Sequence, residues 1–423
     1  MTDQNHQVKK RRVFHIPGYD PIHPRRYREL YRTESAAQAQ ISGYEIDVQA
    51  RQSEQSFGWS VNAHIDEQDV AARIDVLVWS DIVRDSMAQS IPATYWQLVQ
   101  TAWIYISSGT LRRLMWMRKG PVIAALYPVG MLLLQLLVAL GLGLILGNTV
   151  QSILTKVGTL TGIGLIETGG SWVGWALKYL LWAFVTVQLL RWFKGKDNKF
   201  FAYYLMHDYA FSARLNGANP PALEERMKSF GDTIAEAFRS NVDEVLVVGH
   251  SSGAHLAVSI LADLIRQGRV PANGPKLAFL SLGQVVPMVS FLPKARRLRT
   301  DLAFLSTQNA LTWVDVTAPG DGCSFALCDP VSVTGVAPPG KHWPLVISAA
   351  YTQSLTPARW KELRWRFFRL HFQYLCAFDQ PKDYDYFQIT AGPMTLAQRF
   401  KDRPPSRSRI DVVASKYTSV LPL

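Results

Sequence analysis

A serine between two glycines carries the clearest chemical signal in the sequence. Residues 249–253 read GHSSG, which matches Gly-x-Ser-x-Gly, and an apolar segment (242–248) precedes them while an amphipathic segment (254–267) follows. A sharp turn from a strand into a helix strains the backbone of the serine and lifts its hydroxyl clear of the sheet edge. The two glycines relieve the crowding that side chains would cause. We therefore expect Ser251 to be a nucleophile.

A nucleophilic serine needs a base and two hydrogen-bond donors for the oxyanion. One donor is expected to be the backbone N–H of Ser252, at the positive end of the following helix. The second is expected from residues 15–20, HIPGYD, where a short strand (12–15) ends in a Pro-Gly turn that lets the backbone come close. We favour the N–H of Tyr19, with Gly18 as the alternative. An ordinary Pro-Gly turn would fit the same residues.

The HIPGYD turn, the GHSSG turn and the order of elements between them resemble the α/β-hydrolase fold, on its lipase and esterase side. The resemblance covers about 12–79 and 242–375. It implies an α/β fold with a mostly parallel sheet, helices on both faces, and a Ser-His-Asp triad working through an acyl-enzyme. One departure is an apolar insert between the strand expected at 74–79 and the strand before Ser251. Lids in this family more often come later, so substrates cannot be transferred from it.

The resemblance also implies that an acid and then a histidine follow the nucleophile along the chain. Three aspartates are candidates for the acid. Asp315 lies inside an expected strand (311–316), Asp321 lies in the loop just after it among glycines, and Asp329 precedes a proline. The loop after the strand is the position that the fold uses. Asp321 is therefore favoured over Asp329.

Two histidines follow these aspartates. His342 lies just before the expected last strand (344–350), whereas His371 lies beyond it. The catalytic histidine of the resembled fold belongs after the last strand, which favours His371. Next to the serine, His250 is expected to pack beside the hydroxyl and His255 to pack within the helix.

The insert contains two long apolar runs. Residues 121–150 include no charged side chain, and residues 172–193 include only Lys178 and Arg191. Each run is long enough to cross a bilayer core of ~30 Å at ~1.5 Å per residue. We expect two transmembrane helices, at about 121–147 and 172–193. A re-entrant or surface-lying helix is the alternative for the second.

The charges around these runs predict an orientation. Basic residues flank the pair on both outer sides, namely Arg112, Arg113, Arg118, Lys119, Arg191, Lys194, Lys196 and Lys199. By the positive-inside rule both flanks face the cytoplasm. The expected organisation is a first hydrolase part (1–99), a membrane insert (100–198) and a second hydrolase part (199–423). The expected location is a bacterial-type inner membrane with the catalytic domain on its cytoplasmic side.

Composition narrows the partners. The chain of 423 residues has a formal net charge of +12 and three cysteines, without zinc-finger spacing or an RNP-like aromatic motif. Nucleic acid, a metal and an organic cofactor are therefore not expected, and neither are disulfides. The stretch 359–371 alternates basic with apolar residues. It fits either an anionic membrane surface or a solvated helix face.

These inferences combine into one expected function. The chain is expected to be a membrane-anchored serine hydrolase that cleaves lipid-like or hydrophobic acyl esters with Ser251, His371 and Asp321. A thioesterase or amidase with the same triad fits the same residues. A catalytically inactive hydrolase fold that serves as a membrane scaffold is the alternative from another class.

Overall fold

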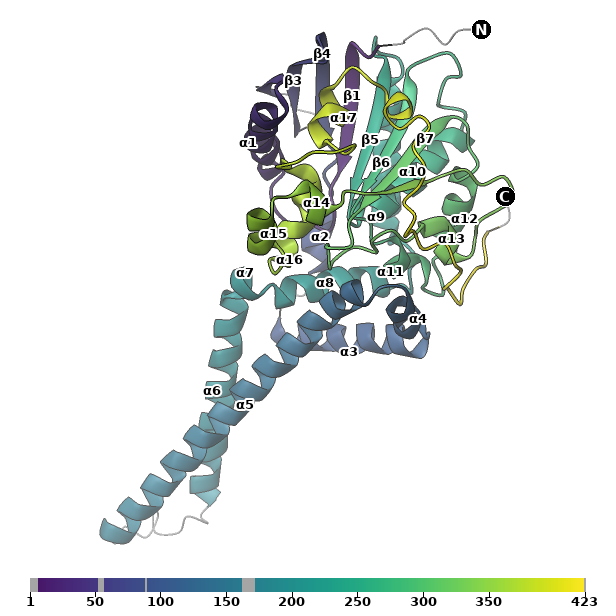
Figure 1. The fold of residues 1–423 in the computed structure, drawn as a ribbon. Coiled ribbons are helices and arrows are strands. Elements are labelled where there is room, and N and C mark those ends of the chain that lie inside the picture. Colours follow the sequence, from purple (N-terminus) through teal and green to yellow (C-terminus); the bar gives the residue numbers. More distant parts are fainter. Residues whose placement is uncertain (1–6, 52–56, 88–89, 162–171, 422–423) are drawn as a thin grey trace. The chain divides into compact units, whose positions relative to one another are not determined.

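One mixed sheet organises the chain. The computed structural model describes residues 7–51, 57–87, 90–161 and 172–421. Within them the strands are β1 (Lys10–Ile16), β2 (Glu45–Arg51), β3 (Phe57–Ile65), β4 (Gln68–Val76), β5 (Glu244–His250), β6 (Lys276–Leu282), β7 (Leu311–Thr317) and β8 (Leu345–Ser348). Their order is β2-β3-β4-β1-β5-β6-β7-β8 (Figure 1). The β2–β3 and β3–β4 pairs are antiparallel, and every other neighbouring pair is parallel.

Burial explains which strands the sequence predicts. All seven residues of β5 are buried, as its run of apolar residues requires for a strand covered on both faces. The expected strands, including one at 276–282, correspond to β1 and β4 to β8, but β4 begins and ends earlier than the expected 74–79. The sequence analysis missed β3, although its second half alternates buried and exposed residues, and it missed β2, because β2 is an edge strand whose residues are exposed or half-buried. Such a strand has a weak hydrophobic pattern.

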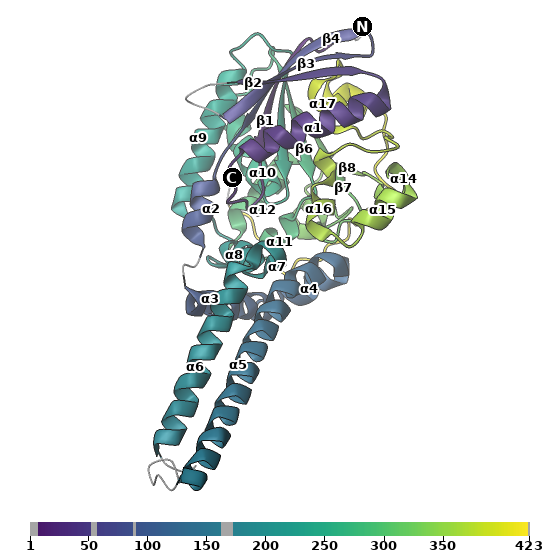
Figure 2. The ribbon, with the colours of Figure 1, turned by 90° about the vertical axis from the view of Figure 1, so that its left-hand side faces the viewer.

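Helices cover both faces of the sheet. In chain order the helices begin with α1 (Arg25–Ser42), α2 (Ser80–Ser86), α3 (Ile91–Ser107), α4 (Thr110–Met117), α5 (Lys119–Thr161), α6 (Trp172–Gly195), α7 (Asp197–Phe200), α8 (Ala202–Ala213) and α9 (Pro221–Ala237). The others are α10 (Gly253–Arg266), α11 (Val286–Ser290), α12 (Arg296–Leu305), α13 (Pro330–Thr334), α14 (Tyr351–Ser354), α15 (Pro357–Leu363), α16 (Phe367–His371), the 3₁₀ helix η1 (Gln373–Leu375), α17 (Tyr386–Ala391) and α18 (Leu396–Arg399). Figure 2 shows α1 in front of the sheet and α10 behind it. The chain is therefore an α/β protein with a mostly parallel sheet.

The chain divides into two compact units. Unit 1 comprises residues 1–86, 103–123 and 212–423, and unit 2 comprises residues 87–102 and 124–211. Unit 1 contains all eight strands named above. A buried ion pair between Arg11 of β1 and Glu244 of β5 joins two central strands, with 2.6 Å between Nε and Oε2. Arg11 also donates to the carbonyl oxygens of Gly392 and Met394, which fixes the C-terminal part of the chain beside the sheet.

Unit 2 contains most of an apolar helix pair, α5 and α6. Both helices are long and apolar enough to cross a membrane, and only 22% and 11% of their most apolar windows are buried in the protein. The expected spans lie within them, and α5 continues beyond its expected end to Thr161.

Three small residues of α5 spaced four apart, Ala139, Gly143 and Gly147, let the backbones of α5 and α6 approach each other. A Cβ atom added at Gly143 would lie 2.9 Å from the carbonyl oxygen of Trp182, and one added at Gly147 would lie 3.0 Å from that of Lys178. One turn earlier, the Thr186 hydroxyl donates to the carbonyl of Ala139 at 3.3 Å. Spacing of this kind is typical of packed helices in membranes.

Candidate active site

Ser251 occupies a strained turn at the carboxyl end of β5. Its φ angle is +55°, in the left-handed region that few residues other than glycine adopt. The backbone N–H donates to the carbonyl of Leu282, at the end of the neighbouring strand β6, at 2.9 Å. Helix α10 begins two residues later. The turn therefore holds the serine at the edge of the sheet, in front of a helix N-terminus.

The glycines around Ser251 are required by close contacts. A Cβ atom added at Gly253 would lie 2.1 Å from the carbonyl oxygen of Ile16, and one added at Gly249 would lie 2.7 Å from the Cα of Ala254. No side chain fits at either position. The loop after β1 therefore lies directly on the turn that carries the serine.

The same loop brings Gly18, one of the two expected sources of the second oxyanion donor, beside the serine. A Cβ atom added at Gly18 would lie 3.0 Å from the Cβ and 3.4 Å from the Oγ of Ser251. The next residue, Tyr19, is buried, and its hydroxyl bonds with the Ser86 hydroxyl at 2.6 Å. Ser252 is buried directly before α10, and no acceptor for its N–H is found among the described residues. The choice between the Tyr19 and Gly18 N–H groups stays a prediction.

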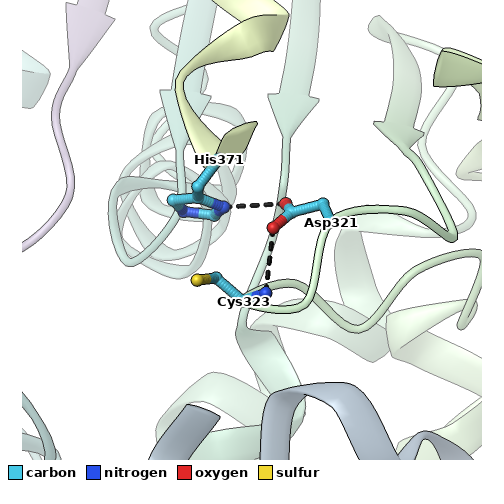
Figure 3. A group of neighbouring side chains, drawn as sticks. All are labelled: Asp321, Cys323 and His371. Atoms are coloured by element: carbon cyan, nitrogen blue, oxygen red, sulfur yellow. Dashed lines mark hydrogen bonds and ion pairs between the residues drawn. The ribbon is translucent and has the colours of Figure 1, made fainter. Parts of the chain in front are cut away.

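Asp321 and His371 form a buried pair 50 residues apart in the sequence (Figure 3). The Nδ1–H of His371 donates to Oδ2 of Asp321 at 2.7 Å. The Tyr374 hydroxyl donates to the same oxygen at 3.0 Å, and the Cys323 N–H donates to Oδ1 at 2.9 Å. Burial alone would raise the Asp321 pKa, but the charge and hydrogen bond of His371 outweigh it and the net pKa is lowered. Asp321 is therefore an ionised, fully oriented carboxylate.

The His371 ring lies next to the serine turn. A Cβ atom added at Gly283, the residue after Leu282, would lie 3.0 Å from Cε1 of His371. Nε2 of His371 is buried and has no hydrogen-bond partner in the described part of the chain. No bond from Ser251 to this nitrogen is present. In enzymes without bound substrate such a bond is often long, so the arrangement is compatible with a base that faces a serine.

His250 supports the position of His371. Its Nε2–H donates to the His371 carbonyl at 3.0 Å, and the ring centroids are 4.8 Å apart. Burial first, and then the charge that His371 would carry when protonated, hold the pKa of His250 well below its ordinary value. His250 is therefore a neutral donor that holds the backbone of His371.

The other aspartates have structural roles. Asp329 caps α13 by accepting from the N–H groups of Val331 and Ser332, and its second oxygen forms an ion pair with Lys341 at 2.6 Å. Asp315 is buried inside β7 and accepts from the Ser281 hydroxyl at 2.5 Å. Burial raises the pKa of Asp315 to about 8. Neither carboxylate has a hydrogen bond to a histidine among the described residues.

The other histidines lie apart from this arrangement. His342 is exposed near the start of β8, and its ring nitrogens lie at 3.2 and 3.3 Å from the carbonyl oxygens of Gly340 and Gln308. His255 is buried within α10, where burial lowers its pKa to about 4. Of the expected acids and bases, the structure therefore pairs Asp321 with His371.

A metal ion could bind at the same place. Asp321, Cys323 and His371 each offer one ligand atom, and these atoms lie within 4.8 Å of one another (Figure 3). Thiolate, imidazole and carboxylate are the ligands that Zn²⁺ takes. Two of these three side chains, however, are already hydrogen-bonded to each other through Nδ1 and Oδ2. A bound Zn²⁺ would compete with the proton that holds this pair together.

Sequence reasoning missed three contributors to the site. Tyr374 holds the carboxylate of Asp321 and also accepts from the Ala318 N–H at 2.9 Å. Gly283 has a φ of +54° and leaves room for the His371 ring, and Cys323 contributes its backbone N–H. The spacing of Tyr374, three residues after His371, is the only signal that the sequence offers for it.

Comparisons with known proteins leave the site to be judged on its geometry. No protein-family model matches the chain, and neither a search of curated proteins nor a search of solved structures finds a match.

Proposed function

We propose that the chain is a serine hydrolase of the α/β-hydrolase type in which Ser251, His371 and Asp321 form the triad. The observation that carries the proposal is the buried Asp321–His371 pair, at the same sheet edge as a serine with left-handed backbone. Structural histidines with a carboxylate partner are common. The unpartnered, buried Nε2 beside a strained serine distinguishes this one.

The geometry supports acyl transfer in two steps. The bond from Nδ1–H to Asp321 fixes the tautomer of His371 that leaves the Nε2 lone pair available. Ser251 Oγ attacks the acyl carbonyl while its proton passes to Nε2, and the N–H groups of Ser252 and Tyr19 hold the oxyanion. Nε2 then protonates the leaving alcohol. In the second step water attacks the acyl-enzyme and gives a proton to Nε2, which passes it to Oγ of Ser251 as the acyl–oxygen bond breaks and the acid leaves.

The apolar helices make the membrane part of the proposal. Helices α5 and α6 would cross the bilayer, and their basic flanks would keep unit 1 on the cytoplasmic side of a bacterial-type inner membrane. Lipid-like or hydrophobic acyl esters are the proposed substrates, because such molecules concentrate where the enzyme is anchored. Thioesters and amides could react through the same groups.

Labelling with a fluorophosphonate probe tests the proposal. Membranes that contain the wild-type chain should be labelled, and Ser251→Ala should abolish labelling. Ser229→Ala, at an exposed serine of α9, is the matched control and should label like the wild type. A folded wild type that takes no label would overturn the proposal. The inactive membrane scaffold would then be the better explanation.

A further inference from the structure

Helices α15 and α16 expose an unusual set of side chains. Trp365 is 71% exposed and Phe367 is 48% exposed. Residues 357–371, which comprise the two helices and the turn between them, contain five Lys and Arg residues and one acidic residue, Glu362, which pairs with Arg366 and Arg369. Large aromatic side chains that remain exposed among cations indicate a surface with a partner.

The exposed strip formed by Arg364, Trp365, Phe367 and Arg369 borders the loop that carries Asp321. A Cβ atom added at Gly322 would lie 3.3 Å from the ring of Phe367, and one added at Gly320 would lie 2.6 Å from the ring of Trp360. Helix α16 ends at His371 itself. The exposed strip and the buried Asp321–His371 pair are therefore the outer and inner sides of the same helix and loop.

A second exposed strip, formed by Arg112 and Trp116 of α4, also leads to this loop. A Cβ atom added at Gly120 would lie 3.4 Å from the Cα of Gly322, and Arg118 Nε–H donates to the Ala326 carbonyl at 2.8 Å. On the adjoining helix α4, Trp116 is 63% exposed, and the guanidinium of Arg112 lies over its ring at 5.2 Å. In Figures 1 and 2, α4 and α16 both lie below the strands.

The second strip continues directly into the first apolar helix. Residues 103–123 belong to unit 1 and contain four basic residues but no acidic one. From Ile123 the same helix, α5, runs on into its uncharged stretch. A membrane that receives this helix would have its surface within a few residues of Trp116, because each helical residue advances only ~1.5 Å.

We propose that the two strips form one docking face for an anionic lipid leaflet. The docking face consists of Arg112, Trp116, Arg364, Trp365, Phe367 and Arg369. Tryptophan and phenylalanine favour the headgroup boundary, and arginines next to them attract anionic headgroups. The charge of the face and its continuity with α5 both favour lipid over a protein partner. The docking itself does not depend on hydrolysis.

Docking has a consequence that rests on the proposed function. With the face on the leaflet, the loop that holds Asp321 and the end of α16 that holds His371 would lie at the membrane surface. An acyl ester could then reach Ser251 from the bilayer without passing through water. The substrate class would be amphiphiles that reside in the leaflet, and short soluble esters would be poor substrates by comparison.

Photo-crosslinking of the full chain tests the docking. p-Benzoylphenylalanine is incorporated in place of Trp365, and the protein is reconstituted in phosphatidylcholine vesicles with or without phosphatidylglycerol. Mass spectrometry should find lipid adducts at position 365, roughly fivefold more with phosphatidylglycerol. The matched control replaces exposed Glu67, in the β3–β4 turn at the opposite edge of the sheet. Equal lipid adducts at both positions, or adducts to a second copy of the chain, would overturn the proposal.

Charge reversal separates the docking from the proposed function. In the triple variant Arg364→Glu, Arg366→Glu and Arg369→Glu, lipid adducts at position 365 should fall. The ratio of vesicle-resident ester hydrolysis to soluble ester hydrolysis should fall roughly tenfold. An unchanged ratio would overturn the route from the leaflet. Lipid adducts without any hydrolysis or fluorophosphonate labelling would instead overturn the proposed function and leave the docking in place.

Discussion

The sheet edge at Ser251 and the helix pair α5–α6 both depend on glycines, but for different purposes. At the sheet edge, Gly253 and Gly18 let one loop lie against the serine, so that polar groups meet at fixed distances. In the helix pair, Gly143 and Gly147 let two backbones approach, and the gain is packing. A substitution at the sheet edge should therefore lower the rate of hydrolysis, whereas a substitution in the helix pair should lower the stability of the α5–α6 packing.

The largest effect should come from the acid. Asp321→Asn keeps the shape of the side chain but no longer holds His371 in the tautomer with a free Nε2. We expect the hydrolysis rate to fall by about 10³–10⁴-fold, with little change in melting temperature. The control, Asp329→Asn, removes the buried charge that pairs with Lys341, and should cost about 3 kcal/mol of stability with the rate of the folded protein nearly kept. A larger loss of rate in Asp329→Asn would reverse the assignment of the acid.

Crowding at the serine should have the next largest effect. Gly18→Ala places a methyl group 3.0 Å from Cβ of Ser251, so the loop or the serine must shift. Overpacking of ~1–3 kcal/mol corresponds to a fall in kcat/KM of ~10–100-fold. Gly231→Ala in α9 has no neighbouring atom closer than 3.9 Å and should leave kcat/KM unchanged. Full activity in Gly18→Ala would show that the loop does not contribute to the site.

The helix pair should respond in stability. Gly143→Leu would drive a side chain into Trp182 and Thr186, whereas a Cβ atom added at Gly141, two residues away, meets no atom within 4 Å. We expect Gly143→Leu to weaken the packing of α5 on α6 by about 1–2 kcal/mol, and Gly141→Leu to be neutral. Disulfide trapping between cysteines introduced on α5 and α6 would measure the difference. Equal trapping in both variants would show that the apolar character of α5 and α6, without close contact at Gly143, is enough to keep the two helices together.

The smallest effect per step should come from Asp315, a buried acid inside the sheet. Its folded pKa of about 8 lies above that of an unfolded aspartate, so its contribution to stability is complete below about pH 4 and is lost as the pH rises toward 8. Asp315→Asn should therefore gain stability over the wild type by roughly 1 kcal/mol for each pH unit in this window. Melting temperatures at pH 5, 6 and 7 would show the gain, with exposed Asp47→Asn as the control. A difference that does not change with pH would mean that Asp315 is ionised in the fold.

The sequence predicts local features of the site better than pairings between distant residues. The turn at Ser251 follows from residues within ten positions of it, and β5 and α10 form where the pattern places them. Asp321 and His371 are 50 residues apart, so their pairing depends on the path of the chain between them. The sequence alone therefore left Asp329 open as the acid and His342 open as the base. Tyr374 could not be predicted, because its role depends on where the Asp321 carboxylate lies.

Some elements of the fold also could not be predicted from the sequence. The edge strand β2 has exposed or half-buried positions throughout, so its pattern resembles that of a loop. Helix α5 continues past its uncharged run to Thr161, since polar residues such as Gln151 and Thr155 do not end a helix. The physical reason is the same in both cases. Hydrophobic patterning reports burial, and both segments are largely exposed or half-buried, so no pattern marks where they begin or end.

The place of β1 in the sheet has a consequence for synthesis. β1 pairs with β4 on one side and β5 on the other, yet more than 160 residues separate these partners in the chain, including α5 and α6. A ribosome adding ~5–20 residues per second needs roughly 10–30 s to make that stretch. During this interval the first four strands present β1 as an unpaired edge. The apolar helices therefore leave the ribosome before β5 can pair with β1. What they bind during this interval decides whether the edge of β1 is still unpaired when β5 emerges.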